Sequence, residues 1–242
     1  MTAHISRRTA LLRGAAIAAG VALGSQALVR PGYAADTRPS ATDIRTAMQQ
    51  AKERRDHALA GQKSLNGWEM EKVTDNRGNI YTRPVPGTGL DAKVRMGDVE
   101  TVLTYVIRRF HYEIDELRRG DVVGWLAPDQ VNHKRAESNL ASGTAVRIRP
   151  GHYPPGQSGG FFPTQKLLVG DILAQCDGIV AWGGEDRIPD ESLFSIKVGP
   201  DDKRLASTAE KLRVWDLTPG KGAGAEADMN VPAQRARARQ HL

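Results

Sequence analysis

One apolar stripe constrains the fold of this chain more than any other feature. Its members are Val99, Val102, Leu103, Val106, Ile107 and Phe110. They recur at intervals of three and four residues, which is the spacing of one face of an α-helix. Asp98 precedes them and is suited to cap the start of that helix. Side chains of this size on one face need a matching surface, so we predict a core helix of a compact domain.

Elements of both kinds surround this helix. Strand candidates occupy residues 121–125, 144–148, 178–182 and 193–198, and helix candidates occupy residues 164–176 and 202–215. The strands are short and rich in β-branched and aromatic residues, whereas the helices have apolar residues at helical spacing. This mixture predicts an α+β domain.

The first 34 residues have the pattern of an export signal. Arg7 and Arg8 precede a short, weakly apolar run, and small residues surround Ala34. The run is too short and too rich in alanine and glycine to span a bilayer stably. We predict a twin-arginine signal over residues 1–34, with an ordinary secretory signal as the alternative. The mature chain would begin near Ala35 in the envelope or outside the cell, with no transmembrane anchor.

The mature chain divides into three predicted parts. Residues 35–92 form an N-terminal extension: a helix over 42–60 with an apolar stripe that includes Ile44 and Met48, a β-hairpin over 66–85 with its turn at 74–79, and a linker or ordered loop over 84–91. Residues 93–216 form the main domain. Residues 217–242 contain few bulky apolar residues, which predicts a disordered tail.

Composition argues against two classes of site. The net charge of +6 comes from the ends: residues 1–34 carry four arginines and no acid, and the segment from Thr218 carries four basic and two acidic residues. The remainder has 26 of each, so the charge is no sign of nucleic-acid binding, and aromatic residues make up only 5%. The single cysteine, Cys176, permits neither an intramolecular disulfide nor a cysteine-based zinc cage.

A motif in residues 137–150 carries a family resemblance. Ser138, Gly143 and Ala145 fall on the spacing S-x-H-x-x-G-x-A-x-D, which is the first metal motif of the zinc D-Ala-D-Ala carboxypeptidase and L-alanyl-D-glutamate peptidase family. Leu140 stands at the histidine position of that motif and Arg147 at the aspartate position. The chain thus resembles this family over roughly residues 94–212, with two ligand positions changed.

Two further pieces follow in the family's order. A Trp-Gly-Gly turn begins at Trp182. The family also has an acidic residue three positions before a His-Phe pair, and here these positions hold Asp190, Leu193 and Phe194. Asp190 matches the family's catalytic carboxylate, whereas Leu193 stands at its last histidine ligand. The resemblance implies a small antiparallel sheet flanked by helices, the Hedgehog-like D,D-peptidase fold, and would imply zinc as the cofactor.

The substitutions at the three ligand positions argue against zinc. A zinc hydrolase needs three protein ligands and an open position for water. Leu140 and Leu193 have no lone pair to donate. The charge of Arg147 about 4 Å from a divalent ion would cost on the order of 8 kcal/mol at an effective dielectric constant of 20. We therefore expect no metal at this location, although a site rebuilt from His133, His152 and nearby acids is an alternative.

Arg147 and Asp190 occupy positions that line one cleft in the family fold. We predict that they form an ion pair in place of the metal. The alternative is that Arg147, with Arg149, binds a carboxylate such as the C-terminus of a stem peptide, because the planar guanidinium group can make two hydrogen bonds to it. The predicted cleft further includes Ser138 and Trp182.

Three functions are compatible with these residues. The first is a non-catalytic protein that binds peptidoglycan stem peptide or a partner through the former active-site cleft. The second is an active cell-wall peptidase with a rebuilt site and Asp190 as its general base. The third is a structural envelope protein. The oligomeric state is not predicted.

Overall fold

A computed structural model describes residues 40–223 and 231–242. Residues 41–242 belong to one compact unit. The predicted export signal at residues 1–34 lies outside the described residues. Among the described helices, none combines the length and the apolar character that crossing a membrane requires.

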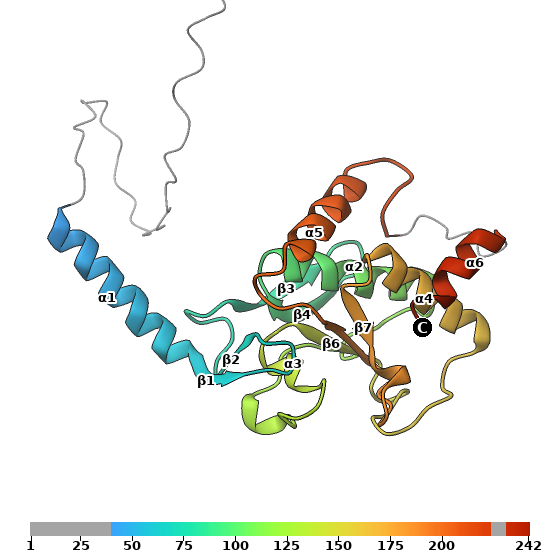
Figure 1. Cartoon of the computed structure of the whole chain (residues 1–242), viewed down its shortest axis with the longest axis horizontal. Coiled ribbons are helices and arrows are strands. Elements are labelled where there is room, and N and C mark those ends of the chain that lie inside the picture. Colours follow the sequence, from blue (N-terminus) through green and yellow to red (C-terminus); the bar gives the residue numbers. More distant parts are fainter. Residues whose placement is uncertain (1–39, 224–230) are drawn as a thin grey trace, which may run out of the picture. The chain divides into compact units, whose positions relative to one another are not determined.

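The centre of the domain is a four-stranded antiparallel sheet (Figure 1). Its strands are β5 (Val122–Val123), β6 (Ala145–Ile148), β8 (Leu193–Ile196) and β7 (Val180–Trp182), in that order across the sheet. All four predicted strands are present. Together with its helices, this sheet confirms the α+β prediction of a small antiparallel sheet flanked by helices.

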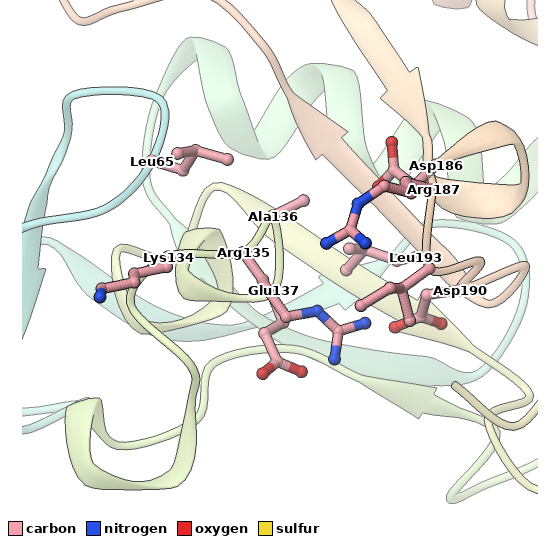
Figure 2. Close-up of a pocket in the computed structure, with 10 residues that line it drawn as sticks. Leu65, Lys134, Arg135, Ala136, Glu137, Asp186, Arg187, Asp190 and Leu193 are labelled. Atoms are coloured by element: carbon pink, nitrogen blue, oxygen red, sulfur yellow. The ribbon is translucent and has the colours of Figure 1, made fainter. Parts of the chain in front are cut away.

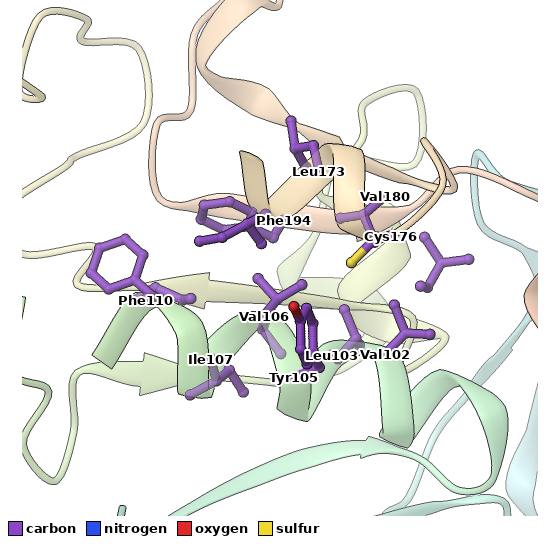
Figure 3. Packing of buried hydrophobic residues seen from close by; sticks show 14 of the residues in the cluster. Val102, Leu103, Tyr105, Val106, Ile107, Phe110, Leu173, Cys176, Val180 and Phe194 are labelled. Atoms are coloured by element: carbon purple, nitrogen blue, oxygen red, sulfur yellow. The ribbon is translucent and has the colours of Figure 1, made fainter. Parts of the chain in front are cut away.

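Three helices form the main core with one face of the sheet. Figure 3 shows the part of this core where residues 102–110 lie beside Leu173, Val180 and Phe194. They are α2 (Asp98–Glu113), α4 (Pro163–Gln175) and α5 (Lys203–Asp216). Every residue of the predicted stripe on α2 is buried, with at most 2% of its surface exposed. Phe110 of α2 meets Phe194 of β8 edge to face, with ring centroids 6.2 Å apart. The predicted core helix is therefore confirmed, but the predicted cap is wrong: Gly97 is the N-cap, no side chain caps the start, and Asp98 is the first helical residue.

The other face of the sheet covers a second, smaller apolar cluster. Side chains alternate along a strand, so Val146 and Ile148 of β6 enter the main core while Ala145 joins this second cluster. The cluster comprises Met70, Val131, Leu140, Ala141, Ala145 and Leu193. Leu140 comes from the short helix α3 (Ser138–Ala141). A face of the sheet that carries α3 rather than a long helix leaves room for a cleft beside it.

The N-terminal extension contains two hairpins, and the predicted single hairpin is wrong. Strand β1 (Leu59–Lys63) pairs with β2 (Glu69–Glu71), and β3 (Ile80–Val85) pairs with β4 (Leu90–Arg95). Buried Glu71 accepts hydrogen bonds from the backbone and side chain of Asn79, which closes the segment between the two hairpins. The predicted linker over residues 84–91 is the β3–β4 turn with its flanking residues, and the proposed boundary at residues 92/93 falls inside β4.

Helix α1 (Ala41–Ala58) matches the predicted helix except at its end, where residues 59 and 60 belong to β1. Its apolar stripe does not pack: Ile44 and Met48 are 47% and 67% exposed. Ala58 is the one buried residue of the helix. Two large apolar residues in 18 are too few to specify a packed face.

Part of the predicted disordered tail is a helix. Residues Pro232–Arg239 form α6, which packs against α4, and Ala238 is completely buried. A side chain at Gly170 of α4 would lie 2.3 Å from the Ala238 carbonyl oxygen, so glycine permits the close approach. Helix–helix contact thus orders a segment whose composition predicts disorder. Residues 224–230 of the predicted tail lie outside the described residues.

Candidate functional site

The structure brings the three family ligand positions to one face of the sheet. Arg147 on β6 and Leu193 on β8 are directly paired across the two strands. Leu140 of α3 belongs to the same apolar cluster as Leu193. Both leucines are buried, so they act here as packing residues.

Arg147 bridges two carboxylates at this place. Its Nε donates to Asp190 Oδ2 at 3.0 Å, and its Nη2 donates to Glu137 Oε2 at 2.8 Å. The other oxygen of Asp190 accepts a 2.6 Å hydrogen bond from Ser192 Oγ. The predicted ion pair between Arg147 and Asp190 is confirmed. Glu137 as its second partner was not predicted.

Glu137 is held in its ionised form by its neighbours. Burial alone would raise the pKa of this carboxyl group. The hydrogen bonds from the Asn132 backbone N–H and from Arg147, with the positive charges of Arg147 and Arg135, outweigh burial and hold the pKa of Glu137 below its usual value. The carboxylate therefore stabilises the fold above its unfolded-state pKa. That contribution is lost as the pH falls through the lower folded-state value.

Replacing Arg147 by methionine is expected to destabilise the fold by about 2–3 kcal/mol. The change leaves Glu137 and Asp190 without their counter-ion, and Asp190 is only 3% exposed. The loss is smaller than for a fully buried pair because 13% of the Arg147 side chain remains exposed. Urea unfolding at neutral pH measures it.

The pH dependence and a rescue variant check this mechanism. The difference in stability between wild type and Arg147→Met should shrink as Glu137 becomes protonated in acid. Adding Glu137→Gln and Asp190→Asn should recover part of the loss, because neutral side chains need no counter-ion. An unchanged unfolding midpoint in Arg147→Met would contradict a stabilising ion pair.

A cleft of about 260 Å³ opens beside this bridge (Figure 2). It is lined by Leu65, Lys134, Arg135, Ala136, Glu137, Asp186, Arg187, Ile188, Asp190 and Leu193. In Figure 2 the guanidinium groups of Arg135 and Arg187 point into the space from two different segments of the chain. Burial raises the pKa of Asp186, and the nearby charge of Asp190 raises it further, against the opposing effect of Arg135.

Of the five predicted cleft residues, Asp190 lines this cleft, and Arg147 adjoins it through its ion pairs with Glu137 and Asp190. The other three do not line it. Ser138 is completely buried, and its Oγ accepts a 2.9 Å hydrogen bond from the Leu65 backbone N–H. Trp182 is buried and donates its indole N–H to the Glu191 carbonyl oxygen at 2.7 Å. Both support the walls of the cleft. A ligand in the cleft would not contact them without rearrangement.

Arg149, the third of these residues, is directed elsewhere. Its backbone has a φ of 51°, which takes the chain out of β6. Its guanidinium group pairs with Asp115 and contacts His152 Nε2 at 2.9 Å. The predicted cooperation of Arg149 with Arg147 therefore has no support in this geometry.

The residues at the family's metal position do not fit zinc. Two leucines and an arginine provide no ligand there. His133 contacts the Pro128 carbonyl oxygen at 2.8 Å on another surface, and His152 lies beside Arg149. Within residues 40–223 and 231–242, no three histidine, cysteine or acidic side chains form a group that could hold a metal ion.

Comparisons with protein-family models, with curated proteins and with solved structures find no match to this chain.

Sequence reasoning missed most residues of the cleft, among them Leu65, Arg135, Glu137 and Arg187. Glu137 and Arg135 stand immediately before the motif that begins at Ser138, so their nearness to the cleft was a usable signal. Arg187 stands three residues before Asp190 and carried a similar signal. Leu65 lies more than 70 residues earlier and reaches the cleft through the hydrogen bond of its backbone to Ser138. No local pattern could have placed it.

Proposed function

We propose that this chain is an exported, non-catalytic protein that binds peptidoglycan stem peptide through the cleft beside Arg147. The observation that carries the proposal is an open cleft lined by three cationic side chains, at the place where the peptidase resemblance puts the active site. Leu140, Arg147 and Leu193 stand at the ligand positions of that family, which argues for binding without zinc-dependent hydrolysis.

The geometry around Asp190 argues against the catalytic alternative. A general base must direct an oxygen lone pair at the proton that it abstracts, and a hydrogen bond to each oxygen leaves fewer lone pairs for this. One oxygen of Asp190 accepts from Arg147 and the other accepts from Ser192. The cleft remains open beside them, which favours a binding protein over a purely structural one.

Binding to purified peptidoglycan tests the proposal. The mature chain from Ala35 onward should sediment with peptidoglycan sacculi and release no dipeptide from muropeptides. Leu65→Asp should weaken binding by about tenfold, because it removes an apolar contact and adds a negative charge at the cleft. Leu217→Asp is the matched control, since Leu217 is 85% exposed and lies outside the cleft. The proposal would be refuted if the protein did not sediment with sacculi. It would also be refuted if the purified protein continued to release dipeptide from muropeptides.

A further inference from the structure

We infer that the cleft recognises the C-terminal carboxylate of a short peptide, bound between Arg135 and Arg187. This inference rests on the proposed function and specifies which part of the ligand the cleft binds. The sequence indicated Arg147 and Arg149 for carboxylate binding, and the structure assigns this role to two other arginines.

Arg135 and Arg187 differ from Arg147 and Arg149 in that neither has a carboxylate within ion-pair distance among the described residues. In the part of the chain that the structure describes, neither guanidinium group forms an ion pair or a side-chain hydrogen bond. Arg147 and Arg149, by contrast, are both paired with carboxylates. Two unpaired guanidinium groups that point into one cleft offer several N–H donors to an incoming anion.

The carboxylates of the cleft cannot neutralise these two arginines fully. Glu137 and Asp190 are already shared with Arg147. That leaves Asp186, which is not within ion-pair distance of either arginine among the described residues. Lys134 adds a further positive charge to the lining. The lining carries three cationic and three acidic side chains, but two of the three carboxylates are bound to Arg147, which does not line the cleft. The cleft therefore favours an anionic group.

The apolar walls and the size of the cleft define what accompanies the anion. Leu65 is 61% exposed and Ile188 is 40% exposed at the cleft, which suits a small aliphatic side chain next to the carboxylate. The volume of about 260 Å³ lies below the usual range of about 300–1,000 Å³ for small-molecule sites. The cleft therefore fits the last one or two residues of a peptide rather than a glycan strand.

Calorimetric titration with defined peptides tests this inference. The probes are N-acetyl-Lys-D-Ala-D-Ala as the free acid, the same peptide as its C-terminal amide, and N-acetyl-Lys-L-Ala-L-Ala as the free acid. The D-Ala free acid should bind at least about tenfold more tightly than the amide. Arg135→Gln and Arg187→Gln should each weaken binding of the free acid by about tenfold and leave binding of the amide unchanged. Arg119→Gln, at an exposed arginine outside the cleft, is the matched control and should bind as wild type does.

The outcomes separate this inference from the proposed function. Equal affinity for acid and amide, or an equal loss in Arg119→Gln, would overturn carboxylate recognition while leaving sedimentation with sacculi intact. Failure of wild type to bind any of the three peptides, with sacculus binding retained, would overturn it too. Failure of the wild-type protein to bind sacculi is the result that refutes the proposed function. Preference for the D-Ala over the L-Ala acid identifies the ligand as cell-wall stem peptide. Equal or tighter binding of the L-Ala acid supports the carboxylate site but points to the C-terminus of a protein.

Discussion

Combining Leu140→His, Arg147→Asp and Leu193→His is expected to create a zinc site that holds about one zinc ion per chain. Residues 147 and 193 are direct partners on neighbouring antiparallel strands, where Cα atoms are about 4.5–5.5 Å apart. Residue 140 lies in the same cluster as residue 193. The three substitutions supply the missing donors and remove the positive charge that repels a metal ion.

Elemental mass spectrometry and thermal unfolding with and without zinc measure this effect. Free zinc at about 100 times its dissociation constant should stabilise the triple variant by about 2.7 kcal/mol. The double variant Leu140→His with Arg147→Asp is the control: it still lacks the third ligand, so we expect neither stoichiometric zinc nor peptide cleavage. Stoichiometric zinc in the double variant would mean that other residues complete the site. Absence of zinc in the triple variant would mean that the three positions do not converge as the peptidase resemblance implies.

Replacing Arg109 by methionine is expected to cost about 3–5 kcal/mol of stability, the largest effect of any single substitution considered. Arg109 lies on α2 with 1% of its surface exposed. It donates to Glu113 on the same helix and to Asp171 Oδ2 on α4 at 2.9 Å. It donates also to the Tyr105 hydroxyl at 2.8 Å. Methionine fills much of the volume but leaves two acidic groups in the core without a counter-ion.

Urea unfolding of matched variants isolates the effect of burial. Arg213→Met breaks an ion pair with Asp98 in which both side chains are more than a third exposed, so its cost should stay below about 1 kcal/mol. Adding Glu113→Gln and Asp171→Asn to Arg109→Met should recover much of the loss, because amides need no counter-ion. Equal unfolding midpoints for Arg109→Met and Arg213→Met would show that the buried network contributes no more than a surface pair.

The candidate site was only partly predictable from the sequence. The resemblance to the peptidase family implied that Arg147 and Asp190 line one cleft, and the two residues do form an ion pair. The same reasoning selected Arg149, Ser138 and Trp182 as cleft residues. Backbone direction decided otherwise: the positive φ of Arg149 turns its side chain to Asp115, and Ser138 is buried under Leu65. Side-chain direction depends on local backbone geometry that residue spacing does not reveal.

Local patterns in the sequence determined the core helix at residues 98–113 and the four strands of the central sheet. They also determined that Leu140, Arg147 and Leu193 offer no ligand to a metal ion. These features follow from spacings of two to four residues and from the chemistry of single side chains, which a sequence states directly. The tertiary structure alone decided which strands pair in the N-terminal extension, whether the last helix docks and how Leu65 reaches the cleft. Each of these depends on contacts between segments far apart in the chain, such as the Leu65–Ser138 hydrogen bond and the packing of Ala238 on Gly170. These contacts contribute to stability only after the domain has folded, so no local sequence pattern predicts them.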